Sequence, residues 1–195
     1  MAITTEDIKA LRERTGVSVI QCKKALEEAG GDQEKALVIL RKHSANAAAK
    51  KANRELASGV VQAYIHVSKD IGAMVTLSCE TDFVAKNEEF ISLAYDIALH
   101  VAATDPEFLS RSEVTEDSMK SAKEVFASEV ADKPKEMQEK ILEGKLDAYF
   151  KDKVLLEQEF VKDPSVTIEK LVAGATQKFG EKVELTKYIR FSTRA

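Results

Sequence analysis

The chain has 195 residues, of which 44% are hydrophobic and 32% are charged, and its formal net charge is −4 at pH 7. This balance excludes an intrinsically disordered chain, and no apolar run reaches the roughly 18–20 residues that a membrane-spanning helix needs. The N-terminal sequence MAITTEDIKALRERTG is polar and periodic, unlike a signal or transit peptide, so we expect a cytoplasmic protein with no membrane partner.

Residues 1–54 predict three short helices followed by a helical linker. Each helix begins at a residue that favours capping positions, and the caps are Thr4 or Thr5, Ser18 and Asp32. Glycines end the first two helices, at Gly16 and at Gly30–Gly31. Apolar residues at helical spacing predict the inner faces: Ile8 and Leu11; Val19, Cys22, Leu26 and Ala29; and Ala36, Leu37 and Leu40. The sequence SANAAAKKANRE favours helix, so we expect it to join this small bundle to a second domain, residues 55–195.

The second domain is expected to begin with an antiparallel hairpin around the turn sequence SKDIG. Alternating apolar residues predict the inner faces of its strands: Ala63, Ile65 and Val67, then Ala73, Val75, Leu77 and Cys79. Asn87 can cap the following helix, which is expected to end at Asp105–Pro106. The predicted inner face of that helix contains Phe90, Ala94, Ile97 and Val101.

More helix and a last strand complete the predicted elements. Residues 115–156 are typical of helix interrupted near Pro134, and a break at Asp163–Pro164 precedes a helix that ends at Gly180. In the last strand one face is expected to carry Val183, Leu185, Ile189 and Phe191. Two early strands and a terminal one, with helices between them, indicate an α+β fold with a small three-stranded antiparallel sheet packed with helices.

No residue pattern indicates an enzyme. His43, His66 and His100 lie in separate contexts, where surface or hydrogen-bonded core histidines are the simplest interpretation. Cys22 and Cys79 each lie on an apolar stripe and are expected to be buried free thiols. Neither a metal-binding spacing nor a phosphate-binding loop is present in the sequence, so we expect no catalytic residue, no metal site and no cofactor.

The sequence CETDFVAKN, which follows the second predicted strand, places an aromatic residue among charged ones. One interpretation is that Phe83 folds back under the helix that begins at Asn87. The other is that Phe83 is exposed, because Asp82 and Lys86 favour a surface loop. An exposed aromatic beside a charge is typical of a protein-binding hot spot. The residues alone therefore indicate an interaction protein with a wedge at positions 81–84.

Four stretches resemble the bacterial elongation factor Ts family. CETDFVAKN, from Cys79 to Asn87, and LRERTGVSVIQCKKAL, from Leu11 to Leu26, are similar to the two signatures of that family. LLEQEFVKD, from Leu155 to Asp163, and the closing YIRFS are also similar to it. The stretches occur in the family's order, and the similarity runs essentially end to end.

The resemblance implies a guanine nucleotide exchange factor for elongation factor Tu, the GTPase that carries aminoacyl-tRNA to the ribosome. It implies binding to that partner in its GDP-bound and nucleotide-free states, without covalent chemistry. The N-terminal module is then expected to resemble ubiquitin-associated domains and to contact the partner's nucleotide-binding domain through Leu11, Arg12, Thr15, Gly16, Val17 and Ser18. The family's loop that disturbs the partner's Mg²⁺ site corresponds to Thr81, Asp82, Phe83 and Val84.

The length of the chain leaves room for one core domain, as in the short form of the family. The short form forms a homodimer, so we expect a homodimer here, with the C-terminal strand at the interface. A small sheet with an apolar face to cover fits such pairing.

Two other classes of function fit part of the sequence. The three-helix module alone would serve an adaptor that binds another protein, with the second domain only a dimerisation platform. Residues 1–54 carry 11 Lys or Arg and 7 Asp or Glu, and this basic excess would suit an RNA-associated translation protein. No dense basic stripe with interleaved aromatics is present in the sequence, so we expect no direct nucleic-acid binding. The adaptor alternative leaves the residues at positions 81–84 unexplained, and the RNA alternative would require RNA binding with a steep salt dependence.

Overall fold

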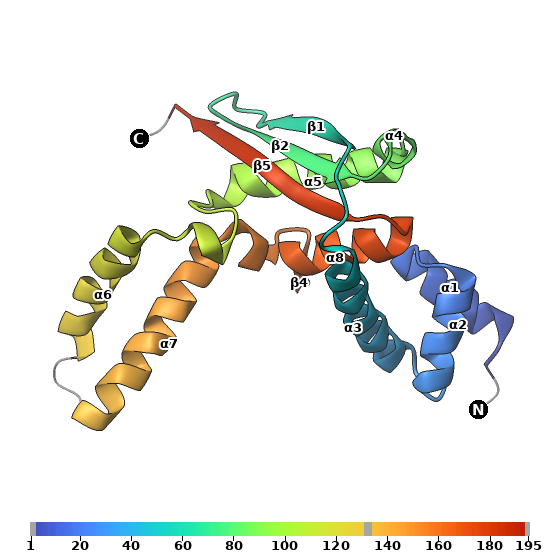
Figure 1. Ribbon diagram of the computed structural model, residues 1–195, viewed down its shortest axis with the longest axis horizontal. Helices are drawn as coiled ribbons and strands as arrows, with labels where there is room; N and C mark the ends of the chain where they lie inside the picture. The colour runs from blue at the N-terminus through green and yellow to red at the C-terminus, as the bar shows by residue number, and fades with distance from the viewer. Residues whose placement is uncertain (1–2, 131–133, 194–195) are drawn as a thin grey trace. The chain divides into compact units, whose positions relative to one another are not determined.

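The computed structural model describes residues 3–130 and 134–193 (Figure 1). The helices are α1 (Thr5–Thr15), α2 (Val19–Glu28), α3 (Gln33–Lys51), α4 (Asp82–Ala85), α5 (Glu88–Thr104), α6 (Glu116–Val130), α7 (Lys135–Lys153) and α8 (Ile168–Phe179), with short 3-10 turns η1 (Arg111–Glu113) and η2 (Leu155–Glu157). The strands are β1 (Ser58–Ile65), β2 (Ile71–Cys79), β3 (Glu159–Phe160), β4 (Asp163–Thr167) and β5 (Val183–Ser192). The predicted α+β fold is confirmed.

The predicted three-stranded antiparallel sheet is present, with strand order β1-β2-β5 (Figure 1). A second sheet pairs β3 with β4 in antiparallel orientation. The sequence prediction missed this second sheet, because it took Asp163–Pro164 as a break, whereas these residues begin β4. Helix α8 consequently begins at Ile168, after the strand.

The chain divides into two compact units. The first comprises Met1–Gln62, Val75–Asp96 and Glu169–Thr186, and the second comprises Ala63–Met74, Ile97–Ile168 and Lys187–Ala195. The first unit therefore contains the N-terminal helices together with parts of the predicted second domain. A boundary between independently folding domains at residue 54 stays a prediction.

The predicted caps of the N-terminal helices are confirmed. In α1 the Thr4 hydroxyl accepts a hydrogen bond from the Asp7 N–H at 3.1 Å, while the Asp7 carboxylate accepts from the Thr4 N–H at 2.9 Å. This reciprocal capping box satisfies amide groups that have no partner inside the helix. Ser18 caps α2 and Asp32 caps α3 through a side-chain oxygen that accepts a hydrogen bond from one backbone N–H of the first turn.

The three N-terminal helices enclose one small apolar core. Its buried members are Leu11, Val17, Cys22, Ala25, Leu26, Ala36 and Leu40. The prediction that Val19 faces inward was wrong, because its side chain is 52% exposed. Val17, which precedes the Ser18 cap, is buried instead. An apolar residue just before the cap commonly packs back against its own helix, and this arrangement leaves the first helical position to solvent.

The alanine-rich tail is helical, as predicted, and it is packed rather than free. Helix α3 continues to Lys51, and Ser44 on this tail is buried. The single Ser44 hydroxyl proton has two acceptors within reach, the Leu40 carbonyl at 3.0 Å and the Gln177 side-chain oxygen in α8. The tail therefore has tertiary contacts with α8 within the first unit, in addition to its helical propensity.

The predicted inner face of β1 was wrong, and the residues expected there are exposed: Ala63, Ile65 and Val67. The His66 N–H donates to the Ile71 carbonyl at 2.9 Å, a pairing that places Tyr64 opposite Ala73. Because opposite residues of paired strands share a face, Tyr64 lies on the face of the buried Ala73, and Ile65 lies on the other. Both sets of alternating residues in β1 contain apolar side chains, so periodicity alone did not decide the face.

The prediction for β5 is correct for its first half only. Val183 and Leu185 are buried, whereas Phe191 is 63% exposed and Ile189 is also exposed. The half-buried residues of the second half are Tyr188 and Arg190. The Tyr188 hydroxyl donates to the Pro106 carbonyl at 2.9 Å, and Arg190 Nε donates to the Ala102 carbonyl at 3.1 Å. These contacts with the end of α5 determine which face of the strand is covered.

The predicted core residues of β2 and α5 are confirmed. The buried side chains include Ala73, Val75, Leu77 and Cys79 from the strand and Phe90, Ala94, Ile97 and Val101 from the helix. Asn87 precedes α5, and its Oδ1 accepts a hydrogen bond from the Glu89 N–H at 2.9 Å. The 81–84 loop therefore connects two elements that are both anchored in apolar cores.

Candidate functional site

His100 and the two cysteines lie in the interior of the protein. His100 is buried, and its Nε2 lies 2.9 Å from Gln158 Oε1. Burial lowers the pKa of His100, which favours the neutral ring. Cys22 and Cys79 are both buried and free, as predicted. Across the described part of the chain, no group of three His, Cys, Asp or Glu side chains is arranged to hold a metal ion.

The 81–84 loop displays its aromatic residue to solvent. Thr81 caps α4, a helix of four residues, and the Phe83 side chain is 83% exposed. Val84 is only 5% exposed and points into the core. Of the two interpretations of Phe83, exposure is therefore the one that the structure supports, while Val84 anchors the loop from below.

Asp82 is exposed beside Phe83. Its carboxylate accepts a hydrogen bond from Lys86 Nζ at 2.6 Å, four residues further along the chain. This contact with Lys86 lowers the pKa of Asp82, so the carboxyl group is ionised at neutral pH. The loop thus presents an apolar ring and a negative charge at adjacent positions.

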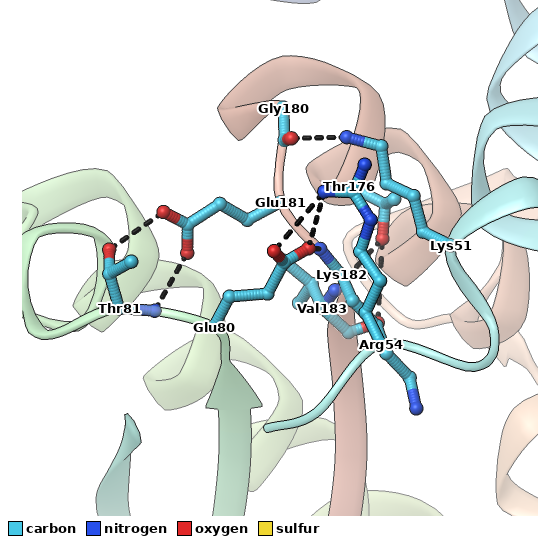
Figure 2. Close-up of polar contacts among 9 residues, drawn as sticks. All are labelled: Lys51, Arg54, Glu80, Thr81, Thr176, Gly180, Glu181, Lys182 and Val183. Carbon is cyan, nitrogen blue, oxygen red and sulfur yellow. Dashed lines mark hydrogen bonds and ion pairs between the residues drawn. The ribbon is translucent and has the colours of Figure 1, made fainter. Parts of the chain in front are cut away.

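Polar contacts fix the base of the loop, as Figure 2 shows. Glu181 accepts two hydrogen bonds from Thr81, one from its N–H at 3.0 Å and one from its hydroxyl at 2.7 Å. Both carboxylate oxygens of Glu80 lie 3.1 Å from Arg54 Nη1, and Glu80 also accepts a hydrogen bond from the Lys182 N–H. The Lys182 N–H and Arg54 lower the pKa of Glu80, in that order of importance.

The predicted contact residues of the N-terminal module divide into two groups. Leu11 and Val17 are inside the bundle core and present almost no surface to a partner. Arg12, Gly16 and Ser18 are exposed. Thr15, the remaining predicted contact, is half-buried and its hydroxyl donates to the Leu11 carbonyl at 2.7 Å. Partner contact through these residues stays a prediction.

A groove of about 550 Å³ lies between the end of α1 and helix α5. Its lining residues are Arg12, Glu13, Arg14, Thr15, Gly16, Glu89, Ser92, Leu93, Asp96 and Lys178. Lys178 forms an ion pair with Glu89, and burial lowers the pKa of Lys178. Sequence reasoning missed Glu89, Lys178 and Glu181, because nothing in their local pattern marks them and only the fold brings them to the predicted sites.

None of the helices within residues 3–130 and 134–193 combines the length and the apolarity that crossing a bilayer requires.

Comparison with known proteins agrees with the family that the sequence resembles. The model of the family Elongation factor TS matches residues 40–195. Elongation factor Ts of Thermodesulfovibrio yellowstonii is 45% identical over 98% of this chain and 96% of the relative. Elongation factor Ts of Desulforamulus reducens is 46% identical over 97% of this chain and 88% of the relative. Elongation factor Ts of Herpetosiphon aurantiacus is 45% identical over 98% of both chains. The chain belongs to the elongation factor Ts family.

Proposed function

We propose that this translation elongation factor is the guanine nucleotide exchange factor for elongation factor Tu, and that the 81–84 loop promotes GDP release. The observation that carries the proposal is the exposed Phe83 ring on a short, capped helix beside the ionised Asp82. The exposed Phe83 side chain contributes little to the packing of the protein itself, so it is available to bind a partner.

The target of the loop is the partner's Mg²⁺ and phosphate site. A GTPase holds GDP through a phosphate-binding loop and a Mg²⁺ ion that demands near-ideal octahedral geometry. Insertion of Phe83 into an apolar crevice of the partner would gain about 2–3 kcal/mol from burial. This burial free energy can offset the cost of displacing the partner's groups around the Mg²⁺ ion. The negative charge of the Asp82 carboxylate would further disturb the electrostatics near the ion.

Exchange then follows from linkage between two binding equilibria. If the factor weakens the partner's affinity for GDP, GDP weakens the partner's affinity for the factor by the same ratio. The factor would therefore bind the nucleotide-free partner tightly and leave when nucleotide and Mg²⁺ return. No covalent bond is made or broken, so the factor acts as a binding protein, in the cytoplasm where translation occurs, without a cofactor and without contacting nucleic acid itself.

The test is the release of fluorescent GDP from purified elongation factor Tu. Wild-type protein should accelerate release, and Phe83→Ala should lose most of that acceleration while its circular dichroism stays unchanged. If the wild-type protein binds elongation factor Tu without accelerating release, the exchange function is wrong and the adaptor function takes its place.

We also propose that the protein forms a homodimer through the second unit. Ile65 lies over Gly72, since a Cβ at Gly72 would be 2.6 Å from Ile65 Cδ1, and the exposed Met74 shares that face of β2. Ile189 and Phe191 are exposed on the face of β5 opposite to the one that contacts the end of α5. An uncovered apolar sheet face of this kind favours self-association.

Sedimentation velocity tests the homodimer. The wild-type protein should sediment as a dimer, and Phe191→Glu should shift it toward the monomer by placing a charge in the apolar contact. A monomeric wild-type protein at micromolar concentration would contradict the homodimer without affecting the exchange function.

A further inference from the structure

We infer that Glu181 is a positioning residue for the 81–84 loop: it holds Thr81 so that Phe83 is aimed before the partner arrives. This inference deepens the proposed exchange function and rests on it. Glu181 lies 100 residues from Thr81 in the sequence and belongs to neither signature segment, so its role is visible only in the structure.

The contact between Glu181 and Thr81 is bidentate. Glu181 Oε2 accepts from the Thr81 N–H at 3.0 Å, and Glu181 Oε1 accepts from the Thr81 hydroxyl at 2.7 Å (Figure 2). One carboxylate thus holds the backbone and the side chain of the same residue. Two simultaneous hydrogen bonds to an ionised acceptor restrict orientation as well as distance.

The remaining polar groups of Thr81 are also satisfied. Its carbonyl accepts from the Ala85 N–H at 3.2 Å and from the Cys79 thiol at 3.2 Å. Its hydroxyl oxygen in turn accepts from the Val84 N–H at 3.5 Å, as a helix cap does. Thr81 is therefore fixed through its amide, its carbonyl and its hydroxyl, and this fixes the extended conformation from which α4 begins.

Glu181 is itself held in place by the turn between α8 and β5. Gly180 ends α8 with a positive φ of 72°, and its carbonyl accepts a hydrogen bond from Lys51 Nζ. The next residue after Glu181 is Lys182, whose N–H donates to Glu80. Two consecutive residues of the turn thus bind two consecutive residues of the chain at the end of β2, as Figure 2 shows.

The loop needs such external support because its own structure is short. Helix α4 has four residues, and a single helical turn is not stable by itself in water. Phe83 is 83% exposed, so its own packing does little to orient it. A loop that is ordered before binding loses less conformational entropy on binding, so the same contacts give a larger effect on the partner.

The first test compares Glu181→Ala with a matched control, Glu184→Ala. Glu184 is an exposed carboxylate on the same segment, and its ion pair is with the Lys182 side chain at 2.9 Å. GDP release from elongation factor Tu is measured against factor concentration to obtain the maximal rate and the half-saturating concentration. We expect Glu181→Ala to lower the maximal rate by about 3- to 10-fold, as the loss of hydrogen bonds to a charged group would, whereas Glu184→Ala retains the wild-type rate.

Variants of Thr81 locate the effect in the bidentate contact. Thr81→Ser retains the hydroxyl group and should lose less activity than Thr81→Val, which keeps the backbone N–H but has no hydroxyl to donate to Glu181. Adding Thr81→Val to Glu181→Ala should produce a total loss smaller than the sum of the two single losses, because the hydrogen bond between the two side chains can be lost only once, although the Thr81 cap on the Val84 N–H is removed as well. Fully additive losses would mean that the two residues act independently, and this would overturn the inference.

Loop mobility supplies a readout that does not depend on the partner. The sequence contains no tryptophan, so Phe83→Trp introduces a single fluorescent reporter at the tip of the loop. We expect Glu181→Ala to lower the time-resolved anisotropy of Trp fluorescence in this background, and Glu184→Ala to leave it unchanged. Equal anisotropy in all three proteins would overturn the inference.

The outcomes separate failure of the inference from failure of the proposed function. If wild-type protein does not accelerate GDP release, the exchange function fails, and the anisotropy still tests whether Glu181 orders the loop. If wild-type protein accelerates release and Glu181→Ala matches it with the same melting temperature, only the positioning role fails.

Discussion

The 81–84 loop and residues 11–17, which form the end of α1 and the turn after it, use apolar residues in opposite ways. Phe83 is displayed to solvent on a loop held by polar contacts, whereas Leu11 and Val17 are enclosed in the bundle core. Both segments lie in motifs that resemble family signatures. The presence of an apolar residue in such a motif therefore does not show whether its side chain is exposed to a partner or buried in the core. The distinction follows from tertiary packing, because the fold covers one apolar side chain and leaves the other uncovered.

The largest effect that we expect is on the free energy of unfolding, which should distinguish the buried Leu11 from the exposed Phe83. Leu11→Ala should lower the free energy of unfolding by about 2–5 kcal/mol, because it leaves a cavity in a small core. Phe83→Ala should change it by less than about 0.5 kcal/mol, because an exposed ring loses few contacts. Urea unfolding followed by circular dichroism at a fixed protein concentration measures both. Similar losses in the two variants would show that Phe83 is packed in solution.

A second prediction concerns the turn after α1. Gly16 has a φ of 66°, and a Cβ there would also lie 2.7 Å from Lys178 Cε, although that flexible side chain can move away. Gly16→Ala should therefore cost about 1–2 kcal/mol, mainly through the left-handed backbone conformation.

The matched control is Gly144→Ala in α7, where nothing lies within 4 Å of an added Cβ. Alanine is the better helix former, so this control should gain about 0.5–1 kcal/mol. A loss of the same size in both variants would mean that the left-handed conformation of Gly16 is not what makes the glycine necessary.

The smallest expected effect concerns the charge on the loop. Lys86 lowers the pKa of Asp82, so the pair's contribution is present above the ordinary value of 3.8 and is lost as the pH falls through the lower folded value. Lys86→Gln should raise the pKa of Asp82 toward 3.8, with Thr81 and Val84 amide signals unmoved. An NMR titration of the Asp82 carboxyl carbon measures this shift. An identical pKa of Asp82 in both proteins would show that the ion pair with Lys86 does not form in solution.

Local sequence signals determined most of the elements of this protein. The caps at Thr4, Ser18 and Asp32 and the helix end at Gly16 were predictable, because each depends on the conformational preference of a residue and its nearest neighbours. The candidate loop was also recognisable, because an aromatic residue among charges is unusual at the surface. Its four residues were predicted from the sequence and their role stays a proposal, while the exposure of Phe83 was left open between two interpretations.

The tertiary structure determined which face of each strand is buried, and the alternation of apolar residues in the sequence could not determine this. Both faces of β1 carry apolar residues, so only its pairing with β2 placed Tyr64 on the inner face and Ile65 on the outer one. In β5, contacts of Tyr188 and Arg190 with backbone carbonyls determined which half-buried face was covered. The support of the loop by Glu181 was equally hidden, because a hydrogen bond between residues 100 positions apart leaves no periodic trace in the sequence. Short-range preferences are encoded locally, whereas burial and long-range polar contacts exist only once the fold has brought the residues together.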